Sequence, residues 1–110
     1  MRRVAIALLG LIGLPLATPG ELTIHALFTD HAVLQQGCPV PVWGRGADGE
    51  RVTVSFQQQR LTTVASNGQW QVTLQSLRPG GPFTLTVHSH PLNGSGQGRT
   101  IRRTDILVGE

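Results

Sequence analysis

The chain has 110 residues, of which 39% are hydrophobic and 14% are charged, a size and balance that fit one folded domain. Nine basic residues, all of them arginine, stand against six acidic residues and give a formal net charge of +3. Two arginines lie at positions 2 and 3 and most of the others are scattered, so the sequence lacks the clustered basic stripe of a nucleic-acid-binding surface, and we expect no nucleic-acid partner.

Residues 1–20 have the layout of a secretory signal peptide. Arg2 and Arg3 precede an uncharged apolar run over 4–16, and small, turn-forming residues follow at 17–20. The apolar run is shorter than the about 20 residues that span a membrane. We therefore expect a secreted or periplasmic protein, cut after Ala17 or Gly20, with no membrane span after cleavage. An uncleaved N-terminal anchor is the alternative.

Residues 21–110 alternate between apolar and polar positions, which is typical of strands with one buried face. The clearest case is 51–56, where Val52, Val54 and Phe56 share one face. No helical period is present after Gly20. The candidate strands are 22–26, 32–35, 40–43, 51–56, 70–75, 83–88 and 100–108. We predict an all-β, immunoglobulin-like or jelly-roll-like sandwich of about seven to eight short strands.

Turn residues separate these candidate strands. Asp48-Gly49 and Asn67-Gly68 are pairs that tolerate positive φ, whereas 78–82 and 93–98 are longer breaks rich in glycine. The polar run 57–60 is interpreted as a hairpin connection. Proline cannot donate a ladder hydrogen bond, so Pro39 and Pro41 predict that the strand at 40–43 lies at a sheet edge.

Cys38 is the only cysteine, so the chain forms no internal disulfide. A free cysteine packs as a small apolar residue, which favours a buried Cys38, while pairing with another chain is the alternative.

Six phrases, in order along the chain, resemble the opening region of the sialate O-acetylesterase family. The first reads LFTDHAVLQQ at 27–36, and the second reads CPVPVWG and corresponds to the "pvpvWG" phrase of that family. The phrases lie at 27–36, 38–44, 49–54, 67–70, 80–87 and 105–110. Together they cover nearly all of the chain after Gly20. Ala32, where methionine is common, and Gln36-Gly37 depart from the pattern.

The resemblance implies an accessory sandwich before an SGNH-type hydrolase domain that removes acetyl esters from sialic acids or related sugars. In the family the nucleophilic serine follows the last of these strands, and its histidine and aspartate partners lie further on. We therefore expect this chain to be a fragment without catalytic residues, inactive alone, with the hydrolase domain as its partner in cis. Ser95-Gly96-Gln97 imitates the serine phrase, but it precedes the strand and is interpreted as a flexible loop.

Several side chains invite a functional interpretation. Asp30, His31 and Trp43 are candidate contacts to a second domain or to a sugar. For Asp30 and His31 a simpler interpretation is that Asp30 caps a turn and that His31 packs at the end of a strand. Trp70 is in phase with Val72 and Leu74 and is predicted to be core.

His88 and His90 face the same way on one strand, but no third metal ligand is evident, and we predict neither metal nor cofactor. The alternatives to an esterase accessory domain are a free-standing carbohydrate-binding sandwich and a structural immunoglobulin-like module. An exposed apolar patch at Phe28, Val33 and Leu34 would favour the structural module.

Overall fold

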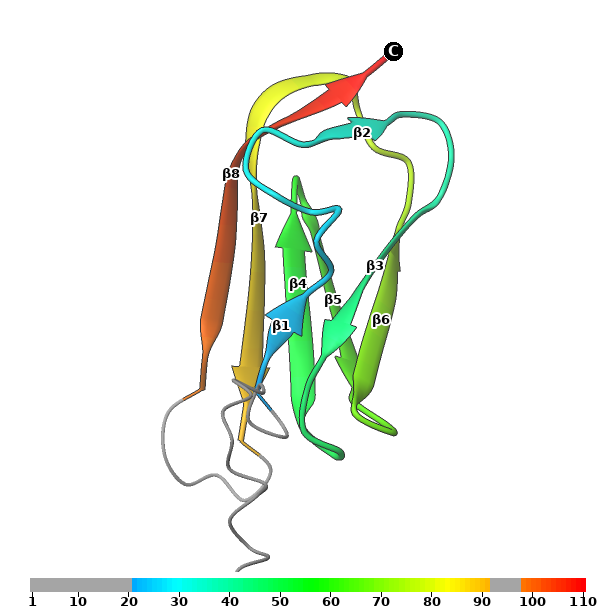
Figure 1. Cartoon of the computed structure of the whole chain (residues 1–110). Coiled ribbons are helices and arrows are strands. Elements are labelled where there is room, and N and C mark those ends of the chain that lie inside the picture. The colour runs from blue at the N-terminus through cyan, green and yellow to red at the C-terminus, as the bar shows by residue number, and fades with distance from the viewer. Residues whose placement is uncertain (1–20, 92–97) are drawn as a thin grey trace, which may run out of the picture.

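A computed structural model describes residues 21–91 and 98–110, which form an all-β structure (Figure 1). The strands are β1 (Thr23–Ile24), β2 (Val33–Gln35), β3 (Val40–Arg45), β4 (Arg51–Phe56), β5 (Gln59–Val64), β6 (Gln69–Leu74), β7 (Gly80–His90) and β8 (Thr100–Gly109). Within these described residues, no helix is long and apolar enough to cross a membrane. The predicted signal peptide at 1–20 and the Ser95-Gly96-Gln97 phrase lie outside the described residues.

The strands form two sheets, one of three strands in the order β1-β3-β6 and one of five in the order β2-β8-β7-β4-β5 (Figure 1). All pairings are antiparallel except that of β2 with β8, where Val33, Leu34 and Gln35 run parallel to Leu107, Val108 and Gly109. The predicted β-sandwich and the predicted number of strands are confirmed. Parallel pairing of β2 with the last strand was not predicted, since it joins segments that are about 70 residues apart.

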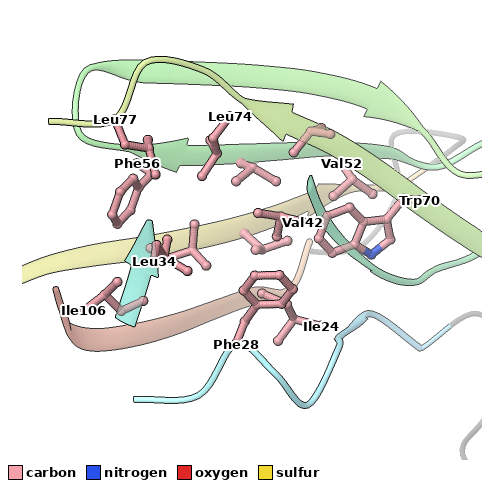
Figure 2. Close-up of a cluster of buried hydrophobic side chains, with 14 of the residues drawn as sticks. Ile24, Phe28, Leu34, Val42, Val52, Phe56, Trp70, Leu74, Leu77 and Ile106 are labelled. Carbon is pink, nitrogen blue, oxygen red and sulfur yellow. The ribbon is translucent and has the colours of Figure 1, made fainter. Parts of the chain in front are cut away.

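One face of each strand fills the space between the sheets, as the alternating pattern predicts. Val52, Val54 and Phe56 of β4 are all essentially without exposed surface, and Trp70 retains 2%. Figure 2 shows Phe56, Leu34 and Ile106 toward one end of this cluster and Ile24 and Trp70 toward the other. Core positions for Trp70, Val72 and Leu74 are confirmed.

The tight turns behave as their residue types predict. Gly49, Asn67 and Gly68 all have positive φ, with values of 85°, 57° and 75°. Asn67-Gly68 closes a two-residue turn between Ser66 and Gln69, which exchange both backbone hydrogen bonds, at 2.8 and 3.1 Å. The Asp48 carboxylate accepts a 2.6 Å bond from the Gly68 amide, so the two turns brace each other where the chain crosses between sheets.

The prediction that 40–43 forms an edge strand is wrong, because β3 lies between β1 and β6. The prolines are tolerated because β1 is short and pairs only with Gly44 and Arg45. The Trp43 carbonyl accepts from His25 on the β1 side, and residues two apart in a strand point their backbone groups the same way. The nitrogen of Pro41 therefore points to the same side of β3 as β1. Because β1 does not extend as far as Pro41, no strand there needs a hydrogen bond from this nitrogen.

Strand β5 was not predicted, and the run 57–60 is only in part a connection. Gln57 and Gln58 form the turn, but β5 begins at Gln59 and pairs with β4 along its full length. Its inward positions are only half-buried because β5 lies at the sheet edge, so its sequence carries no clear apolar alternation. At the other end of the chain, β1 stops at Ile24, and Ala26, expected within that strand, is exposed.

The prediction of a buried Cys38 is wrong, because its thiol is exposed. Cys38 follows Gly37, which has a φ of 81°, in the connection between β2 and β3. Gly37, Cys38 and Pro39 are all exposed, so the backbone turns this part of the connection toward solvent. The apolar character of cysteine favours burial only where the backbone delivers the side chain to the core.

Candidate functional site

The candidate residues Asp30 and His31 lie against an irregularity in β8. Between the pairs Leu85 with Arg103 and Phe83 with Ile106, β7 supplies one residue and β8 supplies two, Thr104 and Asp105. This is a β-bulge, and Asp105 takes a positive φ of 54°. A bulge leaves backbone groups without partners in the ladder, and they need partners from elsewhere.

Asp30 and His31 supply those partners for Thr104. The Asp30 carboxylate accepts a 2.7 Å hydrogen bond from the Thr104 amide, and the His31 amide donates a 2.9 Å bond to the Thr104 carbonyl. Asp30 therefore caps a backbone amide that is 74 residues away, whereas the simpler interpretation expected it to cap a local turn. The sequence signal for the bulge is a change of phase, because Ile101 and Arg103 are half-buried at odd positions whereas Ile106 and Val108 are buried at even ones.

The imidazole of His31 lies 3.6 Å from the carboxylate of Asp105, with side chains 75% and 56% exposed. Water screens such an exposed pair, so it contributes little to stability. A catalytic histidine–carboxylate pair works in a preorganised site from which water is excluded. This pair lies open to solvent, so the geometry favours a structural contact over acid–base chemistry.

Replacing Asp30 by alanine is expected to lower the stability of the domain by about 1–2 kcal/mol, since it removes a charge-assisted hydrogen bond from an amide that the bulge leaves unpaired. For a domain of this size that loss corresponds to a melting temperature about 4–16 °C lower in a circular dichroism scan. Asp30→Asn keeps the acceptor oxygen and is expected to recover most of the loss. His31→Asn, which tolerates the positive φ of 70° and removes only the exposed imidazole, is the matched control. Equal melting temperatures for Asp30→Ala and the unmodified chain would contradict this role.

The candidate Trp43 is half-buried and packs on the loop that follows β1. Its ring centroid lies 4.6 Å from that of His25 and 5.3 Å from that of Phe28, the latter edge to face. These contacts already cover part of the aromatic surface that a sugar ring would use. Segment 25–32 connects the three candidates, because it contacts Trp43 at one end and β8 at the other, where Arg103 donates a 2.9 Å bond to the Phe28 carbonyl.

A polar groove of about 390 Å³ lies beside the β4–β5 turn and is lined by Gln57, Gln58, Gln59, Gln75, Ser76 and Arg78. Two of its amides are already bonded to the backbone. Gln57 bonds to both the amide and the carbonyl of Arg78, and Gln59 does the same with Gln75. These side chains tie the β4–β5 hairpin to the chain after β6. The glutamines of the groove therefore have a structural role, which accounts for their arrangement without a ligand.

His88 and His90 lie with ring centroids 4.7 Å apart, and the Nδ1 atom of His88 is 2.7 Å from the Thr100 hydroxyl. Across residues 21–91 and 98–110, no three His, Cys, Asp or Glu side chains come together as a metal site. The exposed apolar patch at Phe28, Val33 and Leu34 that would favour a structural module is not present, because Phe28 is 5% and Leu34 8% exposed and only Val33 faces solvent. The side chains of Phe28 and Leu34 point inward because segment 25–34 docks onto β8.

Comparison with known proteins identifies relatives of one kind. No family model matches the chain. Sialate O-acetylesterases of Pongo abelii and Homo sapiens are each 32% identical to it in an alignment 78 residues long, and the match covers 63% of this chain and 14% of theirs. The crystal structure of a carbohydrate acetylesterase from Xanthomonas citri matches 82% of this chain and 19% of its own, with 36% identity and a TM-score of 0.70.

These matches confirm the resemblance that the ordered phrases indicated. They also show that the chain spans 14% of the length of the curated relatives and 19% of the neighbouring structure. The similarity thus covers one sandwich within much longer esterases.

Proposed function

From its kinship with sialate and carbohydrate acetylesterases, we infer that this chain is the accessory β-sandwich domain of an enzyme of that kind. The observation that carries the proposal is the match to the Xanthomonas citri acetylesterase, which has 36% identity and extends over 82% of this chain but only 19% of that enzyme. A sandwich that makes up so small a share of an esterase is consistent with a separate catalytic domain in cis, which the resemblance implies to be of the SGNH type.

In such an enzyme the catalytic domain would carry the serine that attacks the acetyl carbonyl and the histidine that takes its proton. The residues of this chain would act as a scaffold. The Asp30 carboxylate is bonded to the Thr104 amide, and the indole of Trp43 packs on His25 and Phe28. These groups stabilise the docking of segment 25–32, which supports a positioning role for the domain rather than a chemical one.

The test compares the 110-residue chain with a chimera in which residues 21–110 replace the matching region of the Xanthomonas citri acetylesterase. The chain alone is expected to hydrolyse p-nitrophenyl acetate no faster than a heat-killed control, and the chimera to hydrolyse it at a rate similar to that of the unmodified enzyme. Turnover by the chain alone, or a folded chimera without turnover, would overturn the proposal.

We further propose that the substrates of the complete enzyme are O-acetylated sialic acids or related acetylated sugars. Acetate release from O-acetylated sialic acid and from an acetylated plant polysaccharide, measured with the complete protein, distinguishes the two substrate classes. Release from neither would leave the acetylated-sugar proposal without support.

Export of the protein, to the periplasm or the medium, is proposed from the signal-like residues 1–20. N-terminal sequencing of the protein recovered from a secreting host is expected to begin after Ala17 or Gly20. A mature protein that still begins at Met1 would contradict cleavage.

A further inference from the structure

The outer face of the five-stranded sheet carries an apolar patch at the end where β2 meets β8. Val33 is 67% and Leu107 45% exposed, and the two are direct neighbours in the parallel β2–β8 pairing. The Leu107 side chain lies over the backbone of Gly81, since a Cβ placed there would be 2.9 Å from its Cδ2 atom. Exposed Pro82 follows directly. We call Val33, Pro82 and Leu107 the cap patch.

The cap patch differs from the neighbouring part of that sheet face, although one exposed apolar side chain, Val64, lies at the far edge on β5. Exposed outer positions on β7 and β8 elsewhere are polar, as at Thr84, Arg102 and Thr104. A sheet with one face in water normally carries polar residues at outward positions, and adjacent apolar side chains there indicate a contact surface.

The position of the cap patch also bears on its partner. Beyond the bulge, the last part of β8 turns to lie beside β2, so that β2 and the C-terminal end of the chain share one end of the sandwich (Figure 1). Leu107 is three residues from the exposed Glu110. A domain joined after this strand would therefore begin next to the cap patch.

We propose that the cap patch packs against the catalytic domain of the acetylesterase, an inference that rests on the function proposed above. The relatives are several times longer than this chain. The resemblance of the ordered phrases implies that their catalytic region follows the strand that corresponds to β8. Interfaces between domains of one chain commonly bury about 600–1,500 Å² around an apolar centre, and the cap patch supplies such a centre.

The test measures burial directly by thiol labelling. In a Cys38→Ser background, which removes the one native thiol of this chain, Val33→Cys, Leu107→Cys and Val64→Cys are each made in the 110-residue chain and in the chimera. Val64 is 56% exposed on β5, at the opposite edge of the sheet, and serves as the matched control. Labelled peptides are quantified by mass spectrometry, so that thiols of the esterase part do not interfere. Labelling at 33 and 107 is expected to be at least about tenfold slower in the chimera than in the chain, with labelling at 64 unchanged.

Each other outcome has a distinct meaning. Equal labelling in chain and chimera at all three positions, with an active chimera, would overturn the cap patch while the accessory-domain function stands. Slow labelling at 33 and 107 in a chain that forms a dimer by light scattering would assign the patch to a second copy and overturn the proposal. An inactive chimera would count against the proposed function as well. Superposition on the intact Xanthomonas citri structure is an independent check, because the rest of that enzyme should cover the positions of Val33 and Leu107 and leave that of Val64 open.

Discussion

Replacing Trp70 by alanine is expected to remove a large part of the stability of the domain. The side chain is 2% exposed, and its indole nitrogen donates to two backbone carbonyls, those of Thr23 at 3.2 Å and Arg45 at 3.1 Å. Removing a buried tryptophan costs about 3–5 kcal/mol through lost packing and the cavity left behind. Domains of this kind have only about 5–15 kcal/mol of stability in total, and small ones lie at the low end. The two carbonyls would also lose their shared donor.

Urea unfolding followed by circular dichroism measures this effect, and Trp70→Phe separates its two parts. Phenylalanine keeps an aromatic ring in the core but cannot donate, so a smaller loss of about 1–3 kcal/mol is expected. Val64→Ala, a truncation of an exposed side chain, is the control and should change the stability by less than about 0.5 kcal/mol. A Trp70→Ala chain that unfolds at the same urea concentration as the unmodified chain would show that the indole does not stabilise the domain.

The second large effect is expected at Gly44, for a steric reason. A Cβ at Gly44 would overlap the carbonyl of Thr23, the same carbonyl that accepts from the Trp70 indole. Gly44 thus allows β1 to approach β3 closely enough for that hydrogen bond. Gly44→Ala must displace β1 from β3, and we expect a loss of about 1–3 kcal/mol or more, as for other overpacked sites.

Gly46→Ala is the matched control for Gly44→Ala. It lies two residues along, and its added Cβ would meet Trp70 and Ala65 side chains at 3.5 and 3.6 Å, which is ordinary contact. Hydrogen exchange of the His25 amide, which bonds to the Trp43 carbonyl beside β1, should accelerate in Gly44→Ala and stay slow in Gly46→Ala. Equal exchange in the two variants would contradict the steric explanation.

Both predictions concern one junction, where the first residues of the domain are fastened onto β3 and β6. Segment 25–32 continues from this junction to the bulge of β8, where Asp30 and His31 bond to Thr104. Segment 25–32 is thus held at the junction with β3 and β6 and at the bulge of β8. Loss of its attachment at either place is expected to loosen β2 and the cap patch, since β2 follows directly after this segment. In the proposed esterase, these residues would affect activity through the placement of the second domain.

The sequence by itself determined those features that depend on neighbours along the chain. Alternation predicted β4, β6 and the core position of Trp70, and turn chemistry predicted positive φ at Asn67-Gly68, because side-chain period and backbone preference act over a few residues. The ordered phrases from 27 to 110 also indicated the esterase relatives. Strand β5 escaped this approach because an edge strand needs little apolar surface.

Only the tertiary structure decided where the distant segments meet. The bond from Thr104 to Asp30 and the parallel pairing of β2 with β8 depend on which strand edges remain open after the sheets form. The exposure of Cys38 depends on how the chain turns between β2 and β3. The apolar neighbours Val33 and Leu107 show the same limit, since their adjacency results from pairing across about 70 residues. Local preferences leave such pairing undetermined, because it is selected by the packing and hydrogen bonding of the whole sandwich.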